Sequence, residues 1–99
     1  MLFLVQSTPL PSKPSSMRGS QSGWWDWINP LLEKGTAKDV YVKLGRGAVV
    51  IFDVESHEAA HKLISQWSEL IPASFEVTAL MSREYQEKIA REAIHPSKL

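Results

Sequence analysis

The chain has 99 residues, of which 43% are hydrophobic and 22% charged, a balance typical of one globular domain over residues 1–99. Eleven basic residues offset eleven acidic ones, so no basic excess indicates a nucleic-acid partner or an anionic membrane. The absence of cysteine excludes disulfides, thiolate catalysis and cysteine-bound metals. The apolar run 1–5 is too short for a membrane span or a signal peptide, so we expect a soluble, cytoplasmic protein.

The first third of the chain predicts a strand, a loop and a helix. Residues 2–6 read as a strand, and residues 7–16 form a loop rich in proline and serine. The helical spacing of apolar residues predicts a helix over about 16–34. The residues that share its apolar face are Trp24, Trp27, Ile28 and Leu31. Pro30 cannot donate a backbone hydrogen bond, so we expect the helix to kink or restart there, with Asn29 as the new cap.

The rest of the chain predicts three further strands and two helices. Apolar patterns place strands at 39–44, 48–54 and 75–80, and helices at 57–70 and 82–94. Ser56 and Ser82 are typical N-caps for the two helices. Residues 82–99 form a helical tail that either packs on a neighbouring subunit or stays solvated. The apolar stripe of this tail consists of Tyr85, Ile89 and Ala93.

The order of these elements is βαββαβ, followed by the helical tail. This order predicts an α+β, ferredoxin-like fold, in which a four-stranded antiparallel sheet carries two helices on one face. The second face of the sheet stays open, and the nearly continuous apolar strand 48–54 favours a partner on it. A second copy of the same sheet would complete a dimeric α/β barrel, so we expect a homodimer or a larger homo-oligomer.

Residues 57–61 read HEAAH, the helical motif in which two histidines bind zinc and the glutamate is the general base of a metalloprotease. On the predicted helix, His57 lies at the edge of the core-facing side, His61 beyond it and Glu58 almost opposite. A catalytic zinc needs a third protein ligand, and His95 is the only other histidine. We therefore interpret the stretch as polar helix surface and predict neither a metal site nor a cofactor.

The residues around the HEAAH motif are more informative about the protein family. The segment FDVESHEAAHKL, together with the opening MLFLV and the strand FEVTAL, resembles the muconolactone delta-isomerase family over residues 1–6 and about 33–80. The resemblance implies a ferredoxin-like protomer, a homodimeric barrel or larger ring, and a proton transfer that shifts a double bond in a small lactone. The family has a histidine in place of Leu4 and a lysine in place of Gln6, so the same substrate is not implied. His61 matches the family's helix histidine, which we interpret as structural.

Strand alternation places five polar side chains on the open face of the sheet. They are Gln6, Tyr41, Lys43, Glu76 and Thr78. Inside a barrel they would line a small-molecule pocket, with Gln6 and Thr78 as ligand contacts. Glu76 would be the general base, and Lys43 or Tyr41 would stabilise an enolate. The alternative is an ion pair between Lys43 and Glu76, with Tyr41 packed beside it.

Trp25 points about 100° away from the apolar face of its helix. It would either wall a pocket for a flat, apolar ligand or anchor an oligomer interface. The interface is the preferred interpretation, because tryptophan is enriched in protein contacts.

Three functions are compatible with these residues and with the resemblance. The first, which we favour, is a cofactor-free isomerase or cyclase that moves a proton on a small, partly apolar, lactone- or enone-like compound. The others are a non-catalytic ligand-binding barrel and a structural homo-oligomer. Leu4 and Gln6 replace the family's histidine and lysine, which favours the two non-catalytic functions. Tyr41, Lys43 and Glu76 favour the enzyme. The fold by itself does not decide among them.

Overall fold

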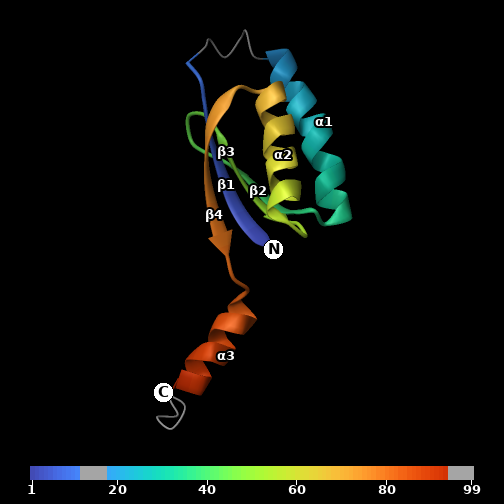
Figure 1. Cartoon of the computed structure of the whole chain (residues 1–99). Coiled ribbons are helices and arrows are strands. Elements are labelled where there is room, and N and C mark those ends of the chain that lie inside the picture. Colours follow the sequence, from blue (N-terminus) through green and yellow to red (C-terminus); the bar gives the residue numbers. More distant parts are fainter. Residues whose placement is uncertain (12–17, 94–99) are drawn as a thin grey trace.

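A computed structural model describes residues 1–11 and 18–93 of the chain (Figure 1). Two helices cover one face of an antiparallel sheet, and a third helix extends away from it. This arrangement confirms the predicted α+β, ferredoxin-like fold. The elements are β1 (Leu2–Pro9), α1 (Arg18–Lys34), β2 (Ala37–Val42), β3 (Ala48–Asp53), α2 (His57–Leu70), β4 (Ala73–Leu80) and α3 (Arg83–Ala93).

The four strands lie in the order β2-β3-β1-β4, and every neighbouring pair is antiparallel. Val5 of β1 lies opposite Val50 of β3 and Val77 of β4, and Phe3 lies opposite Phe52. Residues directly opposite each other share a sheet face, and the buried ones form the layer beneath the helices, whereas Val77 on the edge strand is 49% exposed. The apolar strand β3 is an interior strand, because it lies between β2 and β1.

Trp67 of α2 is the centre of an aromatic cluster between the helices and the sheet. It is 1% exposed, and the ring centroids of Trp24 and Phe75 each lie 5.2 Å from its own. Trp27 and Phe52 follow at 6.2 and 6.5 Å. Tilted and edge-to-face pairs of this kind add to the stabilisation from burial. The apolar faces predicted for the two helices therefore meet over the sheet.

Local capping explains where α2 begins and ends. The backbone N–H of Ala59 donates to the Ser56 Oγ at 3.1 Å, as predicted for an N-cap, and the N–H of Ile71 donates to the Trp67 carbonyl. The predicted restart of α1 at Asn29 is wrong, because the helix runs as one element through Pro30. Asp26 and Pro30 are both exposed, so water can bind the carbonyl that Pro30 leaves unpaired.

β1 extends beyond its predicted end at residue 6 and runs to Pro9. It continues because β4 begins earlier than predicted, at Ala73, and pairs with it up to that residue. Ser7 is 2% exposed, and its Oγ accepts a hydrogen bond from the N–H of Ala48 at 3.0 Å. Residues 7–9 therefore belong to the sheet instead of the predicted loop, and residues 12–16 of that loop lie outside the described residues.

The β2–β3 hairpin turns sharply beside β1. β2 ends two residues before its predicted end at Leu44, whose side chain is fully exposed in the turn. The N–H of Lys43 donates to the Gly47 carbonyl at 2.9 Å, which closes the hairpin. Gly45 and Gly47 adopt φ values of 93° and 112°, a region that favours glycine. A Cβ atom at Gly47 would overlap the Ser7 carbonyl oxygen, so the hairpin tip and β1 are in close contact.

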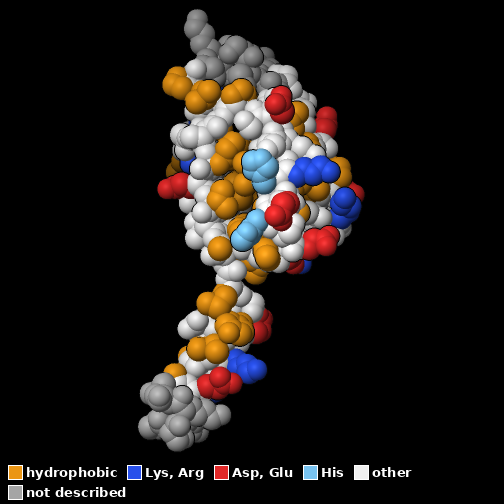
Figure 2. All heavy atoms as spheres, in the orientation of Figure 1, with side chains coloured by type: hydrophobic (Ala, Val, Ile, Leu, Met, Phe, Trp, Pro, Cys, Tyr) orange, Lys and Arg blue, Asp and Glu red, His pale blue; other side chains and the backbone are white. Residues whose placement is uncertain are grey.

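α3 stands apart from the rest of the molecule (Figure 1), and none of its residues is buried. Its cap is as predicted, because the N–H of Tyr85 donates to the Ser82 Oγ at 3.2 Å. Figure 2 shows hydrophobic side chains gathered along this helix, where Tyr85 and Ile89 are 52% and 39% exposed. The predicted continuation to residue 94 lies outside the described residues. No helix in the described part of the chain is both long and apolar enough to cross a bilayer.

Candidate functional site

The HEAAH histidines lie on the molecular surface. His57, Glu58 and His61 are all exposed, and Figure 2 shows histidine side chains on the outside of the globular part. The His57 ring stands edge-on to Phe3, with centroids 5.6 Å apart, and the His61 Nε2 lies 3.5 Å from the Ser65 Oγ. The described residues contain no cluster of three side chains able to hold a metal ion.

The open face of the sheet carries the five polar residues expected there. Strand register aligns Tyr41, Val49, Gln6 and Glu76 in one row across all four strands. The next row contains Leu4 and Ile51, with Thr78 opposite Leu4. Gln6 and Glu76 are direct cross-strand neighbours, whose Cβ atoms are typically about 5 Å apart in such pairs.

Sharing a face does not bring all of these side chains together. Tyr41 lies in β2, Lys43 directly follows that strand, and Glu76 lies in β4. β2 and β4 are the two edge strands of the sheet. Three strand spacings of about 4.8 Å separate them, roughly 14 Å. Tyr41 and Lys43 therefore lie far from Glu76 of the same chain, because alternation gives the face of a residue and not its strand's position.

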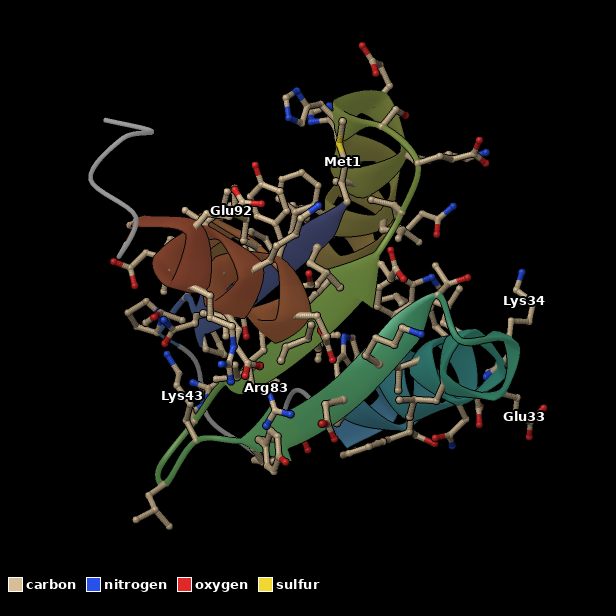
Figure 3. The ribbon with its side chains drawn as sticks, turned by 90° about the horizontal axis from the view of Figure 1, so that it is seen from below. Met1, Glu33, Lys34, Lys43, Arg83 and Glu92 are labelled. Atoms are coloured by element: carbon tan, nitrogen blue, oxygen red, sulfur yellow. The ribbon has the colours of Figure 1, made fainter. Side chains whose placement is uncertain are left out.

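Lys43 has a nearer partner than Glu76. Its Nζ lies 3.3 Å from the Thr8 Oγ1, and it forms no ion pair with Glu76 in the described part of the chain. Figure 3 places Lys43 on the side of the sheet away from the end of α1, where Glu33 and Lys34 lie. Tyr41 is 61% exposed, and Glu76 and Thr78 are also exposed. Within the described residues, these polar side chains on the open face are therefore not covered.

Trp25 lies on the other side of the sheet, in the wall of a pocket of about 270 Å³. The pocket lies between α1, the β2–β3 hairpin, the end of β1 and the end of α2. Trp25 is 42% exposed there. Residues that the sequence did not suggest as site residues also line the pocket, namely Ser7, Trp24, Arg46 and Trp67. The predicted site residues are thus divided between the two faces of the sheet.

The model of one protein family matches residues 1–94, and its description reads "domain of unknown function (DUF3303)". The chain belongs to this family. No curated protein matches the sequence of this DUF3303 chain. Among solved structures, it is similar to 5-chloro-2-hydroxyhydroquinone dehydrochlorinase (TftG) from Burkholderia phenoliruptrix in complex with 2,5-dihydroxybenzoquinone. The identity is 18% and the TM-score 0.61, over 86% of this chain and 98% of the other.

An identity of 18% supports a shared fold and no shared site. The two chains share the ferredoxin-like protomer fold that the resemblance implied. The sequence did not predict the pocket residues as site residues, because they come from four separate elements. Their signal was weak but present: Ser7 follows an apolar strand, and Arg46 stands between two turn glycines.

Proposed function

We propose that this DUF3303 chain is a cofactor-independent enzyme, related in type to isomerases and cyclases, that moves a proton on a small, partly apolar lactone or enone. The proposal rests on where the polar groups lie on the open face of the sheet. A carboxylate lies at one edge, and a tyrosine and a lysine lie at the other, with apolar side chains between them. These apolar side chains are Leu4, Val49 and Ile51.

A second copy of the chain would bring the two edges together. In a face-to-face dimer whose two-fold axis runs along the strands, β2 of one protomer lies over β4 of its partner. Stacked sheets are about 10 Å apart, so side chains from the two sheets come close enough to act on one small substrate. Glu76 would then face Tyr41 of the partner subunit and Lys43 of the partner subunit. The exposed stripe on α3 would gain a surface to pack against in the same assembly.

Each group has a defined task in this composite site. The Glu76 carboxylate takes a proton from the carbon next to a carbonyl, and Gln6, its cross-strand neighbour, would donate a hydrogen bond that orients the carboxylate. The tyrosine hydroxyl or lysine ammonium from the partner stabilises the enolate oxygen. Return of the proton to a different carbon shifts the double bond, and no electron acceptor is needed. The dehydrochlorinase of the same fold acts, by its name, on a small ring compound, which supports a small-molecule role.

The proposal is tested by exchange of carbon-bound hydrogen for deuterium in an unsaturated five-membered lactone, followed by proton NMR in heavy water. The wild-type protein should accelerate the exchange. Glu76→Gln should lower the rate by about 10²–10⁴-fold, because a positioned general base contributes that factor. The double variant Tyr41→Phe/Lys43→Met should be similarly slow.

Mixing the two inactive proteins distinguishes a shared site from a site within one chain. After unfolding and refolding together, half of the dimers are mixed and each regains one intact site, so about a quarter of wild-type activity should return. An inactive mixture in which native mass spectrometry detects mixed dimers would contradict the shared site. A chain that is only an 11.2 kDa monomer at micromolar concentration would contradict the dimer itself.

The second candidate is a non-catalytic homo-oligomeric barrel that binds a ligand or has a structural role. Leu4 favours it, since this apolar residue is at the middle of the open face, between Ile51 and Thr78. If the chain is such a protein, hydrogen–deuterium exchange in the lactone would be no faster with the wild type than with Glu76→Gln. Native mass spectrometry would still detect the dimer.

A further inference from the structure

The pocket behind the β2–β3 hairpin has the size and walls of a small-ligand site. Its volume is about 270 Å³, close to the lower end of the roughly 300–1,000 Å³ found for small-molecule sites, so it fits one ring rather than several. Three of its lining residues are tryptophans. The Trp24 ring centroid lies 4.9 Å from that of Trp25 and 5.2 Å from that of Trp67. Closely spaced aromatic side chains favour a flat, unsaturated ligand.

Two lining residues bring buried hydrogen-bond donors. Ser7 is 2% exposed, and its Oγ accepts from the Ala48 N–H, so the hydrogen of the hydroxyl is left to donate. Trp24 is 4% exposed, and its buried Nε1 has no hydrogen-bond partner. Buried polar groups in folded proteins are nearly always paired, so an unpaired indole N–H calls for an explanation. A nearby acceptor atom on a ligand would provide one.

Arg46 sets the sign of the charge that the pocket favours. Among the described lining residues it alone is charged, and it stands in the hairpin turn between two glycines of positive φ. Its Nη1 lies 3.5 Å from the Leu10 carbonyl, and a guanidinium has five donors in a planar fork that matches a carboxylate. A negatively charged, planar head group fits this pocket better than a neutral or positive one.

We propose that this pocket binds a single-ring aromatic carboxylate, with the ring packed against the wall that the three tryptophans form and the carboxylate toward Arg46 and the buried donors. The site is separate from the proposed catalytic face. Ser7 points to the helix side of β1, whereas its neighbours Gln6 and Thr8 belong to the open face. Binding here can therefore be measured whether or not the chain is an enzyme.

Isothermal titration calorimetry with three probes tests the ligand class. Benzoate has both the ring and the charge, cyclohexanecarboxylate has the charge without an aromatic ring, and benzyl alcohol has the ring without the charge. Benzoate should bind the full chain at least tenfold more tightly than either of the others. Equal binding of all three probes, or no benzoate binding up to 10 mM, roughly the weakest useful fragment affinity, would overturn the proposal.

Single substitutions test the residues. Arg46→Gln should weaken benzoate binding by at least about tenfold and leave benzyl alcohol unchanged. Arg83→Gln is the matched control, because Arg83 is on α3 and does not line the pocket, and it should bind benzoate like the wild type. Unchanged benzoate affinity in Arg46→Gln would place the carboxylate elsewhere and overturn the proposal.

The indole N–H of Trp24 gives a direct signal of occupancy. Trp24→Phe keeps an aromatic ring but removes the donor, and the missing peak in a ¹H–¹⁵N spectrum assigns the Trp24 resonance. In the wild-type protein this resonance should shift in proportion to benzoate occupancy. A fixed Trp24 resonance at saturating benzoate would contradict binding in this pocket, whatever the calorimetry measures.

Discussion

The two faces of the sheet differ in what holds them in place. On the helix side, Phe52 and Val50 are fully buried and each contributes to the core through contacts within one chain. On the open side, Val49 and Ile51 of the same strand are only half-buried, although they are as apolar. A strand with apolar residues on both sides and helices over only one of them is what the proposed dimer would cover on the second side.

This contrast separates residues that determine the fold from residues available for function. All contacts in the aromatic cluster around Trp67 form within one folded chain. The row containing Tyr41, Gln6 and Glu76 is not covered in this way by any of residues 1–11 and 18–93. Substitutions on the two faces should therefore differ in size and in their dependence on protein concentration.

The largest effect is expected at the centre of the covered face. Trp67→Ala should lower the free energy of unfolding by about 3–5 kcal/mol, because it removes a buried indole and leaves a cavity among four aromatic neighbours. Urea denaturation followed by circular dichroism measures the change. A loss below about 1 kcal/mol would mean that the helices and sheet are held together elsewhere.

Two adjacent valines of β3 compare the faces with the same chemical change. Val50→Ala, on the covered face, should lower the free energy of unfolding by about 2 kcal/mol at any protein concentration. Val49→Ala, on the open face, should cost less, and its effect should shrink as the protein is diluted, since the contribution of a dimer contact is lost when the dimer dissociates. If both variants lost the same free energy of unfolding at every protein concentration, the two faces would not differ in this way.

The smallest effect on stability is expected at Glu76. It is exposed and lies at the sheet edge, so Glu76→Gln should change the free energy of unfolding by no more than about 0.5 kcal/mol. Thermal or urea denaturation beside the exchange assay measures both properties. A strongly destabilised variant would indicate that the carboxylate supports the fold, and its loss of exchange would then carry no mechanistic meaning.

Local features of the fold were predictable because neighbouring residues determine them. The bounds of α2 follow from the Ser56 cap and from helical spacing, both contained in a short stretch of sequence. The end of β1 was not predictable in this way, since Pro9 is held in the sheet by Ala73, which is distant in the chain. Pro30 shows the converse case, in which tertiary packing maintains a helix that the local pattern would interrupt.

The candidate site was predictable only in part, for a related reason. Alternation correctly assigns Tyr41 and Glu76 to one face of the sheet, because the period of a strand is a local property. Their placement at opposite edges depends on the strand order, which no short pattern encodes. The pocket is harder still, since Ser7, Trp25 and Arg46 become neighbours only after β1, α1 and the hairpin have packed.

The position of β1 has a consequence for how the chain folds as it is synthesised. β1 is an interior strand, and one of its edges pairs with β4, so that Thr8 and Ser74 are in contact across 66 residues. At a synthesis rate of about 5–20 residues per second, that edge waits roughly 3–13 s for its partner. An unpaired strand edge attracts other chains during such an interval. Chaperones that shield extended apolar segments should therefore raise the yield of this protein more by acting on nascent chains than on released ones.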